Sequence, residues 1–379
     1  MKITGLRIFH VLPRWTFLAI DTDAGIVGYG EPVVEGQSRI VEQALRQLEE
    51  YLVGKDPREI ERHWQAMYRG SFYRGGPIWV SAISGIEQAL WDIKGKFYDA
   101  PVYDLLGGPV RDSIRMYGHA RSTDETDADY AATVRAHQAR GMTAVKVGID
   151  GPVRGIDSLE YVERQVSRFA AMRDAVGSGF DIAIDFHGRT SPAMAKRLIA
   201  ALEPYYPMFV EEPCLPENVD AMVDIARSTV VPIATGERRF TKFEFRELIE
   251  KRAVAILQPD LCHAGGIAET RKIAAMGEAS YLSIAPHNPL GPISLAACLQ
   301  VDACTSNFLI QEYPAVDDGA DLGHGLLGNP FVIEDGSVRL PSGPGLGIEI
   351  DETLLAERAY DGAWPSPVFA HTDGSHGDW

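Results

Sequence analysis

A regular alternation of short apolar runs and helix-length connections governs residues 113–315. The apolar runs lie at 114–117, 144–147, 180–184, 207–210, 231–234, 254–257, 281–285 and 307–310. Amphipathic stretches such as 193–202 and 243–249 lie between most of them, a pattern typical of parallel strands joined by crossover helices. Eight strands within about 200 residues favour a closed β/α barrel over the alternative, an open doubly wound sheet.

The segments on either side of this alternation have a different pattern. Short strands separated by turn residues are predicted at 6–9, 15–20 and 28–30. Helical periodicity follows as far as residue 98, so we expect an α+β domain over residues 1–112, ahead of a barrel domain over 113–315. The segment 316–379 is rich in Gly, Pro and Asp, includes a helical candidate at 352–360, and is expected to fold back on the first domain.

Charge and composition exclude several classes of partner. Acidic residues outnumber basic ones by 53 to 36, which gives a formal net charge of −17. Nucleic acids and anionic membranes bind basic patches, so neither is an expected partner. The chain lacks the run of about 18 apolar residues that a membrane span needs. Four cysteines without CxxC spacing, and an N-terminus without a sustained apolar stretch, predict a cytoplasmic protein.

Carboxylates end three consecutive predicted strands. Asp185, Glu211 and Glu237 follow one another at equal steps of 26 residues, one β/α unit each. The carboxyl ends of barrel strands meet at one mouth, where three anions repel one another unless a cation compensates them. All-oxygen ligation favours Mg²⁺ or Mn²⁺ over Zn²⁺, while helix caps or ion pairs are the alternative. Glu212 competes with Glu211, but side-chain alternation sends only one of them inward.

Histidines and one lysine end other predicted strands. Asp260 and His287 end adjacent strands and are expected to form a hydrogen-bonded pair that makes the imidazole a stronger base. His187 follows the first of the three acids by two residues and would deliver a proton from another side. Lys146 would bind a substrate carboxylate or neutralise an enolate, with an ion pair to one of the acids as the alternative. His263 precedes a glycine turn and is expected to stand behind the site.

A series of short motifs runs in a recognisable order along nearly the whole chain. In the N-terminal region they are Pro13-Arg14-Trp15, Gly28-Tyr29-Gly30-Glu31-Pro32, Phe72-Tyr73-Arg74-Gly75-Gly76-Pro77, Ala89-Leu90-Trp91-Asp92-Ile93-Lys94-Gly95-Lys96 and Leu105-Leu106-Gly107-Gly108. In the barrel they are Asp185-Phe186-His187-Gly188-Arg189, Glu211-Glu212-Pro213, Gly236-Glu237-Arg238, Gln258-Pro259-Asp260 and His287-Asn288-Pro289-Leu290-Gly291-Pro292. This series resembles the mandelate racemase subgroup of the enolase superfamily and, within it, the D-galactonate dehydratase family.

The resemblance implies a modified TIM barrel, (β/α)₇β, with an N-terminal α+β capping domain that the C-terminal segment completes. It implies one Mg²⁺ per subunit, bound by Asp185, Glu211 and Glu237, and a homo-oligomer, which in this family is often an octamer. The implied substrate is a small acid sugar that loses the C2 proton and the C3 hydroxyl to give a 2-keto-3-deoxy acid. Arg14 and Trp15 are expected to close over its polyol end.

The resemblance also assigns catalytic roles by position. His287 would accept the proton with support from Asp260, His187 would donate one, and Glu312 would stabilise the transition state. The racemases of the subgroup have Lys-x-Lys at the second strand, whereas Gly148 stands at the second lysine position here. A two-base racemase is therefore disfavoured. Residues 118–122 differ from the galactonate dehydratases, which leaves open a dehydratase, cycloisomerase or epimerase for another sugar acid such as gluconate, or a non-catalytic binding protein.

Overall fold

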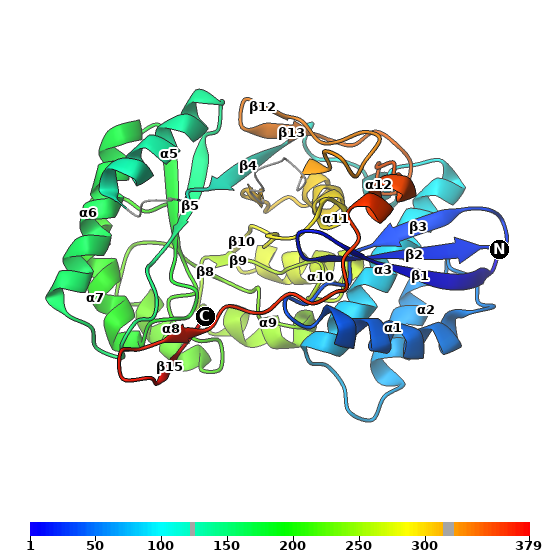
Figure 1. Ribbon diagram of the computed structural model, residues 1–379, viewed down its shortest axis with the longest axis horizontal. Helices are drawn as coiled ribbons and strands as arrows, with labels where there is room; N and C mark the ends of the chain where they lie inside the picture. Colours follow the sequence, from blue (N-terminus) through cyan, green and yellow to red (C-terminus); the bar gives the residue numbers. More distant parts are fainter. Residues whose placement is uncertain (122–125, 314–321) are drawn as a thin grey trace.

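A computed structural model of the chain describes residues 1–121, 126–313 and 322–379. It shows a cap, formed mainly by the N-terminal region, beside a barrel (Figure 1). The cap contains β1 (Ile3–Val11), β2 (Trp15–Thr22), β3 (Val27–Gly30), α1 (Ser38–Leu52), α2 (Ile60–Arg69), α3 (Pro77–Tyr98) and α4 (Val102–Leu105). Its three strands form an antiparallel meander in sequence order, as predicted.

The cap is held together by a close approach between β3 and α3. A Cβ at Gly30 would lie 1.9 Å from the backbone oxygen of Gly85, and one at Gly28 would lie 2.2 Å from that of Ala89. Only glycine allows strand and helix backbones to come this close. The buried side chains of α1, among them Leu45, complete a hydrophobic core that is separate from the barrel's.

Eight parallel strands and the helices between them build the barrel within the described residues. The strands are β4 (Ser113–His119), β5 (Ala144–Gly148), β6 (Asp181–Asp185), β7 (Val210–Glu211), β8 (Ile233–Thr235), β9 (Ile256–Leu257), β10 (Ser283–Ile284) and β11 (Gln311–Glu312). The helices after the first seven are α5 (Asp127–Ala139), α6 (Leu159–Val176), α7 (Pro192–Leu202), α8 (Val219–Ala226), α9 (Thr241–Glu250), α10 (Ile267–Glu278) and α11 (Pro292–Ala303), and the 3₁₀ helix η1 (Glu203–Tyr205) follows α7. This is the closed barrel that the sequence pattern predicted, with the (β/α)₇β order that the resemblance implied.

The last strand closes the barrel by contacting two neighbours in turn. Leu309 first donates its backbone N–H to the carbonyl of Ile284 at the end of β10. The chain then moves across to β4, where Gln311 pairs with Met116 in parallel register. The eighth apolar run, expected at 307–310, is therefore shared between two partners, and regular pairing starts only after it.

One side chain from each barrel strand, or from the residue beside it, fills the barrel interior. These residues, here called the barrel floor, are Tyr117, Ala144, Ala183, Phe209, Ala234, Ile256, Ala285 and Ile310. Alanine at four positions leaves room for the larger side chains of the other four, as in the layered cores of such barrels. The barrel is therefore a packed core and not a channel.

The C-terminal segment contacts both parts of the molecule. A hairpin of β12 (Ile333–Glu334) and β13 (Ser337–Arg339) extends the sheet beside β4. The sequence did not predict this hairpin because its strands are too short to show periodicity. The short helix α12 (Glu352–Glu357) lies against the cap, and the chain then crosses to the barrel, where β14 (Phe369–Ala370) pairs with β15 (His376–Gly377) (Figure 1). The expected boundary at 315/316 lies outside the described residues.

None of the helices in the described residues is long and apolar enough to cross a membrane. The cysteines are free, in keeping with their spacing, and they are also buried; they are Cys214, Cys262, Cys298 and Cys304. Burial raises the pKa of the Cys214 thiol to about 11, so this thiol stays protonated at neutral pH.

Candidate active site

A ring of polar side chains lies one layer above the barrel floor. Strand side chains alternate between the inside and the outside of a barrel, so the residue two positions after each floor residue points the same way. At seven of the eight strands this residue is polar or charged: His119, Lys146, Asp185, Glu211, Gln258, His287 and Glu312. The exception is Gly236, which Glu237 follows directly. The same alternation therefore builds a dry floor and a charged mouth.

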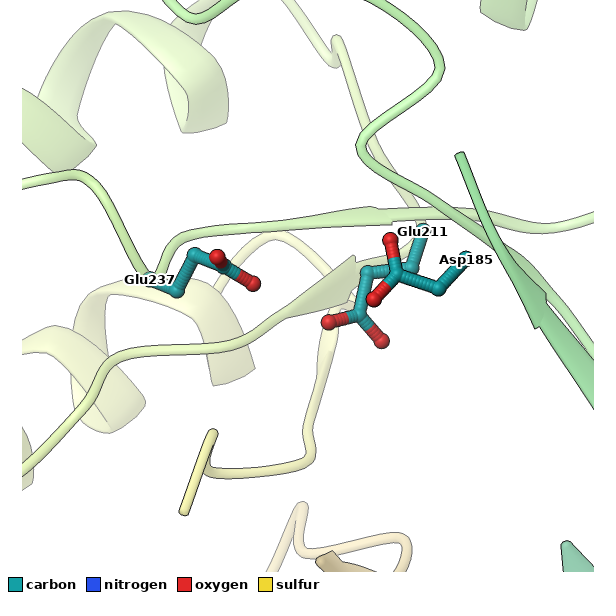
Figure 2. A group of neighbouring side chains, drawn as sticks. All are labelled: Asp185, Glu211 and Glu237. Carbon is teal, nitrogen blue, oxygen red and sulfur yellow. The ribbon is translucent and has the colours of Figure 1, made fainter. Parts of the chain in front are cut away.

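Asp185, Glu211 and Glu237 form a carboxylate cluster at this mouth. One oxygen from each carboxylate lies within 4.8 Å of the others. Strands β6 and β7 place Asp185 beside Glu211 because their parallel register pairs the two residues. Glu237 comes from the loop after β8 and reaches the other two from the opposite side (Figure 2). The three acids that share a sequence step thus meet in space.

The carboxylate cluster is electrostatically suited to a cation. Burial raises the pKa of Glu211 to about 7, and the charge of Asp185 adds to this rise. Burial also raises the pKa of Glu237 well above its ordinary value, with further repulsion from Glu212. A divalent cation would relieve this cost, and carboxylate oxygens are the donors that hard cations prefer. The residues present therefore fit a metal ion.

Lys146 supplies positive charge beside the carboxylate cluster. Its Nζ lies 2.8 Å from Glu211 Oε1, 2.9 Å from Glu312 Oε1 and 3.5 Å from Asp185 Oδ2. The side chain is only 6% exposed. These contacts correspond to the ion-pair alternative for Lys146. Its ammonium group neutralises buried acids in this structure.

Glu212, the competing candidate for the cluster, is held elsewhere. It has a positive φ of 40°, and its carboxylate accepts two hydrogen bonds from Arg238, from Nε at 3.0 Å and from Nη2 at 2.5 Å. A bidentate pair of this kind fixes both partners. Arg238 passes directly over Gly188, where a Cβ would lie 2.1 Å from its Nη2. Only the first of the two adjacent glutamates therefore joins the cluster, as alternation predicted.

The expected pair of Asp260 and His287 is present. His287 Nδ1 lies 2.8 Å from Asp260 Oδ2, and an ionised carboxylate can only accept, so Nδ1 carries the hydrogen. His287 Nε2 then lies 3.4 Å from Glu237 Oε2. Burial alone lowers the pKa of His287, but the charges of Glu237 and Glu312 and the bond to Asp260 outweigh it and raise that pKa well above its ordinary value.

His187 lies near the other oxygen of Glu237. Its Nε2 is 3.9 Å from Glu237 Oε1, and its backbone N–H donates to Asp185 Oδ1 at 2.7 Å. The residue has a positive φ of 54°, which turns the chain sharply at the end of β6. Burial lowers the pKa of its imidazole. Nδ1 is buried and has no hydrogen-bond partner among the described residues.

Glu312 belongs to the same ring and is fully buried. It accepts the backbone N–H of Asn288 at 2.6 Å, and its other oxygen is 2.6 Å from His119 Nε2. Burial raises its pKa, but Lys146, His287 and His119 more than compensate and hold that pKa well below its ordinary value. His119 was not among the predicted site residues, although the two-residue step from the barrel floor identifies it. Ser122, from the divergent loop 118–122, lies outside the described residues.

A cavity of about 220 Å³ opens beside the histidines. It is lined by Val34, Glu35, Pro77, His187, Glu237, Arg238, Phe240, His263, His287 and Trp379. His263, expected to stand behind the site, lines the cavity, and its Nδ1 lies 2.8 Å from Ser81 Oγ. The residues from the cap and the C-terminus were missed because no strand periodicity leads to them.

Arg14 and Trp15 differ from what was expected of them. Trp15 opens β2, is 1% exposed and stacks on Phe17 with ring centroids 5.8 Å apart. This corrects the expectation that its ring closes over a substrate, because the strand directs it into the core. Arg14 donates to the carbonyl of Pro289 at 2.9 Å, and its guanidinium lies 5.1 Å from the ring centre of Trp364. It therefore contacts neighbours of the cavity.

Comparison with known proteins agrees with this geometry. Residues 13–107 match the mandelate racemase / muconate lactonizing enzyme N-terminal domain, and residues 129–354 match the enolase C-terminal domain-like family. The chain is 49% identical to the D-galactonate dehydratase of Ralstonia nicotianae over the full length of both chains.

Solved structures show the same architecture. A mandelate racemase/muconate lactonizing enzyme from Sulfitobacter sp. has a TM-score of 0.90 and 32% identity, covering 97% of this chain and 99% of that one. An enolase from Agrobacterium radiobacter, solved with bound Na and L-malate, has a TM-score of 0.91 and 32% identity over the whole of both chains. Both domain matches and the full-length relatives lead to one conclusion: the chain belongs to the mandelate racemase / muconate lactonizing enzyme family of the enolase superfamily.

Proposed function

We propose that the chain is a Mg²⁺-dependent sugar-acid dehydratase that converts D-galactonate to 2-keto-3-deoxy-D-galactonate. The observation that carries this proposal is the position of His187 and His287, each near a different oxygen of Glu237 in the carboxylate cluster. An acid and a base on two sides of a metal site can remove a hydroxyl and a proton from neighbouring carbons. The identity of 49% with a D-galactonate dehydratase supports the choice of substrate.

In the proposed reaction His287 Nε2 takes the proton from C2, and Asp260 stabilises the imidazolium that forms. The electron pair left at C2 becomes the C2–C3 double bond as the C3–O bond breaks. His187 gives its proton to the departing hydroxyl, which leaves as water. The remaining enol takes up a proton at C3 and releases the proton of its C2 hydroxyl, which gives the 2-keto-3-deoxy acid. Mg²⁺, when bound by the carboxylate cluster, supplies a Lewis acid that makes the C2 hydrogen more acidic.

The other polar residues of the ring would support these two histidines. Glu312 is buried and anionic, so we assign it the stabilisation of the positive charge that His287 acquires. Lys146 offsets the negative charge of Glu211 and Glu312, and this weakens the repulsion between these carboxylates and an anionic substrate. Gly148 ends β5, where a racemase of the subgroup has its second lysine base.

Further features are proposed on the pattern of the family. We propose one Mg²⁺ per subunit, a symmetric homo-oligomer with an octamer as the specific expectation, and a cytoplasmic location. The division into residues 1–112, 113–315 and 316–379 is proposed from the changes of sequence pattern at these boundaries.

A panel of sugar acids tests the proposal. The purified protein with Mg²⁺ would be incubated with D-galactonate, D-gluconate and other aldonic acids, and formation of 2-keto acid would be measured. We expect the highest kcat/KM for D-galactonate and loss of activity when EDTA removes the metal. A higher kcat/KM for another acid would reassign the substrate, and no product from any acid would contradict a dehydratase.

A further inference from the structure

The last residue of the chain lies in the cavity. Trp379 lines it together with His187 and Glu237. The ring centroids of Trp379 and His187 are 6.0 Å apart, with 59° between their planes. A second indole, Trp364, lies 6.0 Å from Trp379 and is itself covered by Arg14. The C-terminus therefore contributes an aromatic wall beside one of the two histidines.

Residues 361–379, here called the C-terminal strap, contact both the cap and the barrel. On the cap side, Arg39 donates to Asp361 Oδ2 at 2.6 Å. On the barrel side, the guanidinium of Arg189 lies 4.8 Å from the ring centre of Phe369. The pairing of β14 with β15 turns the chain back toward the mouth, so the strap spans the distance between cap and barrel (Figure 1). Contacts with both parts thus determine where the terminal indole lies.

The lining of the cavity divides into two chemical kinds. The polar residues are Glu35, His187, Glu237, Arg238, His263 and His287, and the apolar ones are Val34, Pro77, Phe240 and Trp379. A sugar acid also has two kinds of surface, its hydroxyl and carboxylate oxygens and its C–H faces. A flat, rigid indole packs against C–H groups over a large area and loses little conformational entropy on doing so.

We propose that Trp379 is a specificity-determining residue that packs against the substrate carbons beyond C3; this inference rests on the dehydratase function proposed above. His187 acts on the C3 hydroxyl, and Trp379 is the aromatic residue next to His187. The carbon chain beyond C3 therefore extends along the indole, whereas the carboxylate end lies toward the metal. The indole of Trp379 is neither an acid nor a base at neutral pH, so it exchanges no proton with the substrate and acts mainly on binding.

Steady-state kinetics of Trp379→Ala and Trp379→Phe test this inference, with Val368→Ala as a control on the strap that is 76% exposed. The readouts are kcat and KM for D-galactonate and the inhibition constant of D-threonate, a four-carbon acid that barely extends beyond C3. We expect Trp379→Ala to raise KM about 10-fold, with a smaller change in kcat, because a large aromatic contact is lost. The inhibition constant of D-threonate should change less than about twofold, because this shorter acid does not reach the indole of Trp379.

Trp379→Phe should recover most of the lost affinity, and Val368→Ala should behave as the wild type. The inference is overturned if Trp379→Ala weakens both acids equally, if it lowers kcat with KM unchanged, or if it has no effect. The ratio of KM to inhibition constant is measured within one preparation, so partial unfolding of a variant does not alter it. Failure of the dehydratase proposal is separate, because it shows as a wild-type protein without activity on any acid.

Discussion

Glu237 is the residue that connects the carboxylate cluster to proton transfer. Its two oxygens lie 3.4 Å from His287 Nε2 and 3.9 Å from His187 Nε2. Its negative charge is a main reason why the pKa of His287 is raised. A cation bound by Glu237 would offset that charge, lower the pKa of His287 and leave Nε2 free to accept a proton. Metal binding and activation of the base are thereby coupled through one carboxylate.

Replacing each histidine separately distinguishes the base from the acid. His287→Asn should lower kcat about 10²–10⁴-fold, the usual contribution of a general base, and abolish exchange of the C2 hydrogen with solvent deuterium. His187→Asn should also stop product formation but retain C2 exchange, because the base is intact. Exchange followed by NMR in D₂O checks both variants. Persistent C2 exchange in His287→Asn would assign the base to another residue.

Glu237→Gln removes one charge of the carboxylate cluster without changing its size. We expect the variant to require a much higher Mg²⁺ concentration for half-maximal activity, because a neutral amide is a weaker ligand for a hard cation. Measuring activity across a Mg²⁺ titration checks this, with Glu250→Gln on the barrel surface as a control. An unchanged titration curve would contradict the assignment of Glu237 as a metal ligand.

Among the elements, α10 depends on a residue from the cap. Its N-terminus has no capping side chain of its own, and Glu87 from α3 accepts the backbone N–H groups of Ile267 at 2.7 Å and Ala268 at 2.9 Å. Trp91 donates to the same carboxylate at 2.7 Å. Since α3 belongs to the cap and α10 to the barrel, Glu87 joins the two while capping a helix.

The stability of the protein should fall with rising pH through Glu87. Burial raises its pKa from 4.5 to about 7, although the three hydrogen bonds oppose this. The folded state then binds a proton more tightly than the unfolded state, so this contribution is fully present below pH 4.5 and is lost as pH rises through about 7. The shift of the pKa from 4.5 to about 7 corresponds to about 3 kcal/mol.

Melting temperatures of the wild type and of Glu87→Gln between pH 5 and pH 8 check this expectation. Gln cannot ionise, so the wild type should lose stability relative to the variant as pH increases. The exposed Glu250→Gln variant should instead follow the wild type. A constant difference between wild type and Glu87→Gln across this range would show that Glu87 stays ionised in the folded protein.

The elements also explain which parts of the site could be predicted from sequence. Asp185, Glu211 and His287 lie at strand ends, where the repeat of the barrel and the two-residue step of a strand fix their direction. Such periodicity can be recognised from residues that are close together in the sequence. Trp379 and Glu35 reach the cavity through long-range packing of the C-terminal strap and of the cap, which no spacing records. Trp15 was misplaced because a motif position does not show which way its strand faces.

For the whole molecule, the balance of buried charge predicts stabilisation by metal. A ligand that binds only the folded state stabilises it in proportion to RT ln(1 + [L]/Kd). We therefore expect Mg²⁺ to raise the melting temperature by several degrees at pH 8 and by less at pH 6, where protons compete for Glu211, whose pKa is about 7. Differential scanning fluorimetry checks this, with NaCl of equal ionic strength as the control. Equal shifts at both pH values would contradict it.

The barrel floor limits how substrate and product reach and leave the active site. Packed side chains of the described residues close the barrel interior, so a reacting molecule enters and leaves at the mouth, on the side of the cap and the C-terminal strap. Substrate, keto acid and the released water must share this route in turn. We therefore expect the product to inhibit in competition with the substrate, and the rate at which it leaves the mouth to influence turnover.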